Sequence, residues 1–146
     1  MKIKTNTYIV CFQIEKQQYA LPLDQVERVI RMVKVSPLPD SPKWLIGVID
    51  LQGKIVPVLD TRKKLNISTR KPLPTDRLIV INSLEKAFAI TTDEVTSVLE
   101  VPFNEQNEKT ESFDKNIPIS FIVRNDSGMI MVLDIKKLIP INGVIT

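Results

Sequence analysis

The sequence predicts a mainly β protein made of two pseudo-symmetric small β-barrels, and two observations carry this prediction. The first is an internal repeat: residues 19–30 (YALPLDQVERVI) match residues 88–99 (FAITTDEVTSVL) at a constant offset of 69, in an aromatic residue, an alanine, an aspartate and several aliphatics. The second is a series of short apolar runs separated by turn residues, which is typical of barrels. Because the repeat is long and occurs twice only, it favours a paired structure over a solenoid.

The other elements are arranged around a β-hairpin that the sequence predicts near its centre. Two β-branched apolar runs, 45–51 and 55–59, flank a short polar turn in which Gly53 supplies the backbone freedom. Pro57 cannot donate to a ladder, which places the second strand at a sheet edge or at a bend. Asp60 follows in the position of a helix N-cap. We expect the hairpin to be buried, with a short helical turn after it.

The chain before this hairpin is expected to form two strands and a helix. Residues 8–15 alternate between apolar and polar side chains, which predicts a half-buried strand, and 19–23 is expected to return beside it. Asp24 then stands at an N-cap position, and the apolar side chains in 26–30 fall at helical spacing. Three prolines in 36–42 exclude a helix there and predict an extended connector into the hairpin.

The second half of the chain repeats both patterns in the same order. A strand and a helix capped by Asp93 are expected by analogy with Asp24, and residues 132–138 (VLDIKKL) repeat the end of the hairpin, with Asp134 in the place of Asp60. Residues 66–76, which follow the hairpin and its helical turn, are polar, contain two prolines and predict a loop. Residues 102–118 are polar, without periodicity, and are predicted to be a mobile surface loop.

Composition excludes several classes of function. The chain has 146 residues and no histidine, which removes histidine-based triads and most zinc sites. Its four glycines do not form a phosphate-binding loop or a dinucleotide fingerprint. The net charge is only +3 and the basic residues are scattered, so no nucleic-acid partner is expected. No run approaches the roughly 20 apolar residues of a membrane span, and we expect no direct membrane insertion, no cofactor and no metal.

Two candidates for catalysis remain, and both have a simpler structural interpretation. Asp60 and Asp134 end equivalent strands, so a pseudo-twofold axis could bring their carboxylates together to share a proton. Neither is followed by the glycine that an aspartic protease needs, and N-capping explains both. Cys11, the single cysteine, lies in an alternating apolar run, which predicts a core thiol and a reducing, cytoplasmic setting. We therefore expect no enzymatic activity.

Four motifs together resemble the CheW-like domain of bacterial and archaeal chemotaxis. They are Pro37-Leu-Pro, the run 47–60 (GVIDLQGKIVPVLD), Thr92-Asp-Glu-Val95 and Val132-Leu-Asp134, and the resemblance covers nearly the whole chain. It implies two SH3-like five-stranded β-barrels. It also implies a non-enzymatic adaptor that couples chemoreceptors, the methyl-accepting chemotaxis proteins, to the histidine kinase CheA.

The resemblance further implies how the chain is divided and where it works. A single CheW-like domain over residues 7–140, made of two intertwined barrel subdomains, is expected, with terminal tails at 1–6 and 141–146. Its partners would be the regulatory CheW-like domain of the kinase and the cytoplasmic tip of the receptor. The protein would be cytoplasmic and recruited to receptor arrays at the membrane.

The same resemblance implies a receptor-binding groove between the barrels. Carried onto this sequence, the residues that line it are Val10, Leu23, Val26, Val29 and Val95, with Gln52 at the tip of the hairpin. A hydrophobic core would use the same aliphatic side chains, and sequence alone does not separate the two roles. An apolar patch kept exposed for a partner would distinguish them, since isolated soluble domains seldom keep large ones.

One departure from the family pattern bears on the partner. Where the family usually reads Asn-Leu-Arg-Gly, this chain reads Asp50-Leu-Gln-Gly53, so the arginine that the family ties to receptor coupling is a glutamine here. This change predicts weakened receptor coupling. It leaves two alternatives open: a divergent relative that scaffolds another two-component array, and a small-ligand-binding β-barrel, which would need convergent polar groups in a pocket.

Overall fold

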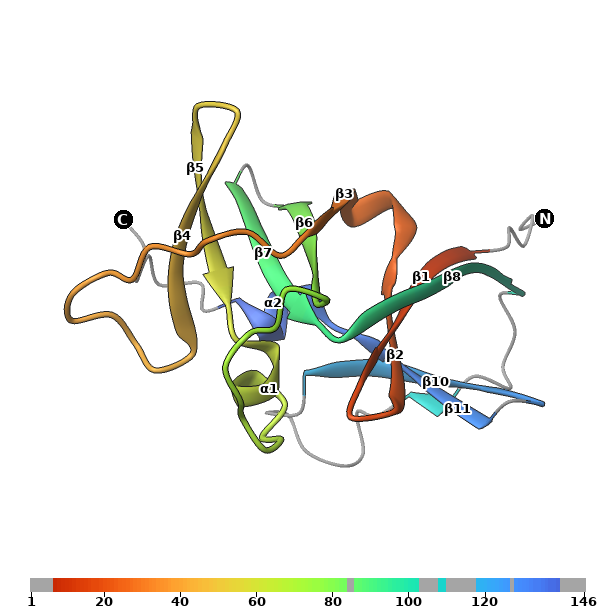
Figure 1. Ribbon diagram of the computed structural model, residues 1–146. Helices are drawn as coiled ribbons and strands as arrows, with labels where there is room; N and C mark the ends of the chain where they lie inside the picture. The colour runs from red at the N-terminus through yellow and green to blue at the C-terminus, as the bar shows by residue number, and fades with distance from the viewer. Residues whose placement is uncertain (1–6, 84–85, 103–107, 110–117, 127, 140–146) are drawn as a thin grey trace. The chain divides into compact units, whose positions relative to one another are not determined.

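The computed structural model describes residues 7–83, 86–102, 108–109, 118–126 and 128–139. Strands dominate, as the sequence predicts, and the helices are short (Figure 1). The elements in chain order are β1 Thr7–Ile14, β2 Gln17–Pro22, the 3-10 turn η1 Leu23–Gln25, β3 Val26–Arg31, β4 Leu45–Leu51, β5 Lys54–Leu59, α1 Thr61–Lys64, β6 Arg77–Ser83, β7 Lys86–Thr92, β8 Glu94–Val101, β9 Glu108–Lys109, β10 Ile119–Asn125, β11 Gly128–Leu133 and α2 Ile135–Leu138.

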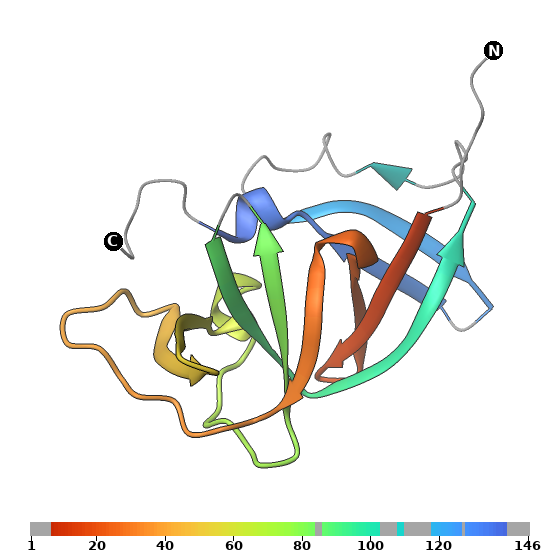
Figure 2. The same ribbon diagram turned by 90° about the horizontal axis from the view of Figure 1, so that it is seen from above.

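The described chain forms two compact units, each built on one sheet. The first unit contains the residues up to Asp24 and those from Val95 onward, and its sheet has the order β8-β1-β2-β11-β10-β9. The second unit is Gln25–Glu94, with the order β3-β6-β7-β5-β4 (Figure 2). Among the described residues no ladder joins the first strand of either sheet to its last, so neither barrel is closed by hydrogen bonds. The mainly β, SH3-like fold is confirmed.

The repeat is visible in the hydrogen-bonded register of the two units. In the second unit Val58 pairs with Ala89 in a parallel ladder, and in the first unit Val132 pairs with Ala20 in the same way. Val58 and Val132 are 74 positions apart, and Ala20 and Ala89 are 69 apart, as in the sequence repeats. The hairpins β4–β5 and β10–β11 also carry a register shift at the same repeat position. The repeat in the sequence is therefore reproduced by equivalent residue pairs in the two sheets.

The two units exchange strands. The hairpin β4–β5 joins the sheet of β6 and β7, and β10–β11 joins that of β1 and β2. The third strand of each repeat is exchanged as well, because β3 pairs with β6 and β8 lies beside β1. Within the described residues the chain thus crosses between units twice, at Asp24–Gln25 and at Glu94–Val95.

The prediction of a helix after Asp24 is wrong, and so is its repeat after Asp93. Residues 26–31 form the strand β3, preceded by a single 3-10 turn, and the equivalent residues form β8. A register shift between Val26 and Arg28 explains the misleading pattern. Such a bulge inserts one extra residue and breaks the period of two, so apolar residues three apart can share a face of a strand. That spacing imitates a helix.

Only two of the four aspartates predicted to be N-caps have that role. The Asp60 carboxylate accepts hydrogen bonds from two backbone N–H groups of α1, and the Asp134 carboxylate accepts one from α2. Asp24 lies inside the 3-10 turn, and Asp93 precedes a strand and contacts arginines instead. The prediction fails for Asp24 and Asp93 because no α-helix follows them.

Each unit has its own hydrophobic core, and the proline-rich connector lies along the outer edge of the second sheet. The cores contain Ile9, Cys11, Ala20, Val101, Val123, Ile130 and Val132 in the first unit, and Ile49, Val56, Val58, Leu78, Val80, Ala87 and Ala89 in the second. The proline-rich connector forms no helix, as predicted, but it is not extended throughout, because it turns at Pro39 and Asp40, where the φ of Asp40 is 56°. Ser36 bridges to Val48 on the outer edge of β4. Of the predicted loop 102–118, only the ends and the two-residue strand β9 lie within the described residues, so its mobility stays a prediction.

Candidate functional site

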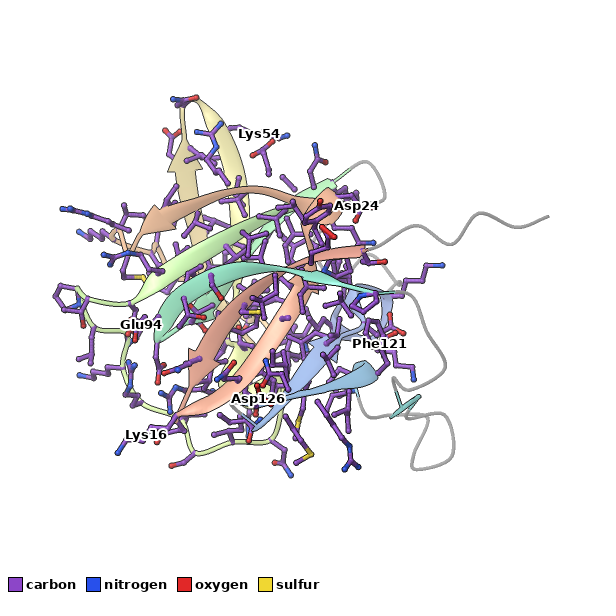
Figure 3. All side chains as sticks on the ribbon, turned by 90° about the vertical axis from the view of Figure 1, so that its right-hand side faces the viewer. Lys16, Asp24, Lys54, Glu94, Phe121 and Asp126 are labelled. Carbon is purple, nitrogen blue, oxygen red and sulfur yellow. The ribbon has the colours of Figure 1, made fainter. Side chains whose placement is uncertain are left out.

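The tip of the hairpin β4–β5 is a preorganised, exposed turn. Gln52 and Gly53 both have positive φ, 55° and 85°, which is the backbone of a two-residue type I′ turn. The Gly53 N–H donates a hydrogen bond to the Asp50 carboxylate at 2.8 Å, which stabilises the turn. Gln52 and Lys54 are exposed there, and Figure 3 labels Lys54 at this end of the hairpin. The position of the expected receptor contact is therefore presented on a fixed backbone.

Only the base of this hairpin is buried, so the expectation of a fully buried hairpin is wrong. Val56, Val58 and Leu59 are inaccessible, whereas Ile55 is 62% exposed. Strand alternation explains the contrast between Ile55 and Val56, because neighbouring side chains point to opposite faces of a sheet. In the sequence, Ile55 lies within the apolar run 55–59, which predicts buried side chains throughout, so its exposure was not predicted. Its exposure adds an apolar contact beside Gln52 at the tip.

Two of the candidate site residues lie on β3, the edge strand of the second sheet. Val26 is partly buried, and Val29 is 41% exposed. An edge strand has free backbone groups on one side, which natural proteins usually protect. Charged side chains flank the valines: Glu27, Arg28 and Arg31 are all exposed. Val29 is thus an exposed apolar side chain among charged ones, whereas its neighbour Ile30 packs against the core of the second unit.

The other three candidates belong to the first unit and differ in exposure. Val10, on β1, is 3% exposed and packs inside the sheet. Leu23 lies in the 3-10 turn and is 39% exposed, and Val95, near the start of β8, is partly buried. Leu23 and Val29 therefore have apolar surface available to a partner, while Val10 has almost none in this structure.

The repeat points to one further exposed valine that the sequence reasoning did not select. Val98 lies on β8, which is the edge strand of the first sheet, and it is 54% exposed. It is the counterpart of Val29, since the two residues are 69 positions apart. Applying the offset of the repeat to Val29 would have found it. The edge strand of each unit thus has an exposed valine at the same repeat position.

The groups that could serve catalysis have structural roles. Burial raises the pKa of the Cys11 thiol, an effect larger than the opposing hydrogen bond with Ser97, so the thiol stays protonated. Asp60 and Asp134 cap helices of different units, as the N-cap interpretation predicts. Within the described ranges no group of three or more acidic or cysteine side chains is placed to hold a metal ion. None of the helices described is long and apolar enough to cross a membrane.

Four charged side chains form an ion-pair cluster in the second unit that sequence reasoning did not find. Arg62, only 5% exposed, donates to both carboxylate oxygens of Asp93 at 2.8 Å. Arg70 donates to Asp93 at 2.9 Å and to both oxygens of Asp76 at 2.8 and 2.9 Å. The paired side chains are 6 to 31 positions apart in the chain, so no local sequence pattern predicts the cluster.

The charges of this cluster keep Asp76 ionised. Burial raises the pKa of its carboxyl group, but hydrogen bonds from Arg70 and from the Leu73 backbone N–H, with the charges of Arg70 and Arg62, outweigh burial and lower it. A lowered pKa in the folded state contributes stability above the ordinary value of 3.8, and that contribution is lost as the pH falls through the folded value. The cluster is therefore intact at neutral pH.

Comparison with known proteins gives one consistent family. The model of the CheW-like domain matches residues 8–141. The chain is 30% identical to the chemotaxis protein CheW of Thermotoga maritima over 131 residues, which cover 90% of this chain and 86% of that protein. It is 26% identical to the chemotaxis protein CheW of Bacillus subtilis over 140 residues, covering 94% and 90%.

A solved structure agrees with these relatives. The crystal structure of the scaffolding protein TtCheW from Thermoanaerobacter tengcongensis superposes with a TM-score of 0.84 at 26% identity. The match covers 97% of this chain and 96% of that one. Family model, curated relatives and fold thus agree over nearly the full length. The chain belongs to the CheW-like family.

Proposed function

We propose that this protein is a chemotaxis scaffold that couples chemoreceptors to the histidine kinase CheA. The observation that carries the proposal is the likeness, over almost the whole chain, to the chemotaxis protein CheW of Bacillus subtilis and to the scaffolding protein TtCheW. The roles found for Cys11, Asp60 and Asp134 support a binding role over an enzymatic one, because each is explained by burial or by N-capping. The partners are the cytoplasmic tip of a receptor and the regulatory domain of the kinase.

The receptor is proposed to bind through exposed apolar side chains and the hairpin tip. Val29 and Leu23 have the apolar surface that a helical receptor tip would cover, and Val10, Val26 and Val95 supply partly or fully buried support. Gln52 is the polar contact, held on its type I′ turn. Interfaces of this kind depend on a few well-packed anchors rather than on total area. The protein is proposed to be cytoplasmic and recruited to membrane receptor arrays by these contacts.

Gln52→Arg is expected to bind a chemoreceptor tip more tightly than the native chain, by about tenfold. Arginine offers up to five charged donors in a rigid fork, whereas glutamine offers two neutral ones. Arg62 does not replace it, because its guanidinium is buried and holds Asp93. Titration calorimetry with a soluble receptor fragment measures the difference.

Gln52→Lys is the matched control, because it restores the charge without the fork. The neighbouring Lys54 already places a flexible ammonium at the tip, so Gln52→Lys should gain less than Gln52→Arg. Equal binding by all three proteins would mean that this position does not contact the receptor. If the native chain bound no chemoreceptor fragment while binding the kinase domain, the Asp50-Leu-Gln-Gly53 motif would favour a relative that serves another two-component array.

A further inference from the structure

The two points at which the chain crosses between units lie within one residue of the same repeat position. The first crossing follows Asp24, and the second follows Asp93 and Glu94, while Asp24 and Asp93 are 69 positions apart. Figure 3 labels Asp24 and Glu94, one at each crossing. A symmetric pair of units would hold both crossings in the same way. The side-chain contacts show that they are held differently.

The second crossing is anchored by side chains from three segments. Asp93 accepts two hydrogen bonds from Arg62 of α1 and one from Arg70 of the following loop. Arg70 is itself fixed by Asp76, whose carboxylate also accepts the Leu73 backbone N–H at 2.8 Å. Because Arg62 and Asp76 are 7% and 5% exposed in their side chains, solvent screens these pairs less than surface pairs. The cluster is therefore a stiff support for Asp93.

The two residues before Asp93 add to this anchoring. The Thr91 hydroxyl accepts the backbone N–H of Thr61 at 3.1 Å and donates to the Thr61 hydroxyl at 3.3 Å. The Thr92 hydroxyl donates to the Arg77 carbonyl at 3.0 Å. Thr91, Thr92 and Asp93, which precede the crossing residue Glu94, thus all have side-chain partners in the second unit.

The first crossing has none of these contacts among the described residues. The counterparts of Thr91 and Thr92 are Pro22 and Leu23, which have no side-chain hydroxyl. The Asp24 side chain is exposed and makes no described hydrogen bond or ion pair. The counterpart of Arg62, 74 positions later on α2, is Lys136, which is exposed and lacks the planar fork that binds a carboxylate at two points.

We infer that Arg62, Arg70, Asp76 and Asp93 form a clamp that fixes the chain where it leaves the second unit, so that the fold has one clamped and one unclamped crossing. Local opening of the backbone then begins at Asp24–Gln25, in the 3-10 turn that carries the exposed Leu23. The clamp is a conformational device of the fold, and it does not depend on which partner the protein binds.

Native-state hydrogen exchange with mass spectrometry tests the clamp on the isolated, full chain. In the native protein, amides of residues 93–98 should exchange at least about tenfold more slowly than those of residues 24–29. Asp93→Asn should raise exchange at 93–98 by about tenfold or more and leave 78–82, in the core strand β6, nearly unchanged. Asp24→Asn, the matched control, should change neither crossing.

Arg70→Gln keeps the test decisive if Asp93→Asn does not fold, because the paired hydrogen bonds between Arg62 and Asp93 remain. It should raise exchange at 93–98 by a smaller factor than Asp93→Asn. Equal protection of the two crossings in the native protein would overturn the inference. So would a rise in exchange that is uniform over the second unit, since that would make the cluster a general stabiliser rather than a clamp.

Discussion

Gly47→Ala is expected to lower the free energy of unfolding by about 3–5 kcal/mol. A Cβ atom at this position would lie 2.2 Å from the Ser36 carbonyl oxygen and 2.9 Å from the Pro37 Cα, and both are backbone atoms that cannot rotate away. Relief requires the connector to move off β4, which breaks the two 2.9 Å hydrogen bonds between Ser36 and Val48. Overpacking of this kind costs about 1–3 kcal/mol, and each lost backbone hydrogen bond about 1 kcal/mol.

Urea unfolding followed by the fluorescence of Trp44 measures this effect. Trp44 reports on the second unit because the Lys64 ammonium lies 5.2 Å from its ring centroid and its carbonyl accepts the Asp60 N–H. Gly53→Ala is the control, because its φ is 85° but its new Cβ meets nothing within 4 Å. It should cost only about 1–2 kcal/mol, the strain of a positive φ. A Gly47→Ala variant no less stable than Gly53→Ala would show that the connector does not cross so closely.

Val29→Asp is expected to weaken partner binding by about 30-fold to 150-fold without unfolding the protein. An unpaired carboxylate that becomes buried in an interface costs about 2–3 kcal/mol or more, which corresponds to that range of affinities. Val29 is 41% exposed in the free protein, so its carboxylate variant would remain solvated there. Val95→Asp tests the partly buried position on β8 in the same way. Titration against a receptor fragment, with circular dichroism of each variant, separates affinity from folding.

Leu38→Asp is the matched control for this experiment. Leu38 is 38% exposed, close to the value for Val29, and lies in the proline-rich connector outside the proposed contact. Its substitution should leave binding within about threefold of the native value. If Val29→Asp and Val95→Asp both unfold, these valines are core residues and the proposed contact is wrong. If Leu38→Asp weakens binding as much as Val29→Asp, the loss is not specific to β3.

The features that sequence reasoning predicted well are those set by local patterns. The hairpin turn at Gly53 follows from a glycine between two β-branched runs, and the caps at Asp60 and Asp134 follow from an aspartate before a short helical turn. The duplication follows from two constant offsets, which the register of the sheets reproduces pair by pair. The turn and the caps are local signals, and the duplication is found by comparing two short segments of the sequence.

The features that were missed depend on partners distant in sequence or on a broken period. The bulge in β3 allows apolar residues three positions apart, Val26 and Val29, to occur in a strand, although this spacing is typical of a helix. No residue type in that segment predicts a bulge. The bonds of Asp93 to Arg62 and Arg70 span 31 and 23 positions. Partial exposure also cannot be read from residue type, since Val10 and Val29 are both valines in strands, one buried and one open to solvent.

The central claim, that this chain is a chemotaxis scaffold, is tested most directly by a pull-down of the CheA regulatory domain encoded in the same genome. The tagged native chain is expected to recover that domain. Recovery of the kinase domain by the native chain is the result that the account predicts. Failure of a folded native chain to recover it, at micromolar concentrations of both proteins, would contradict the account.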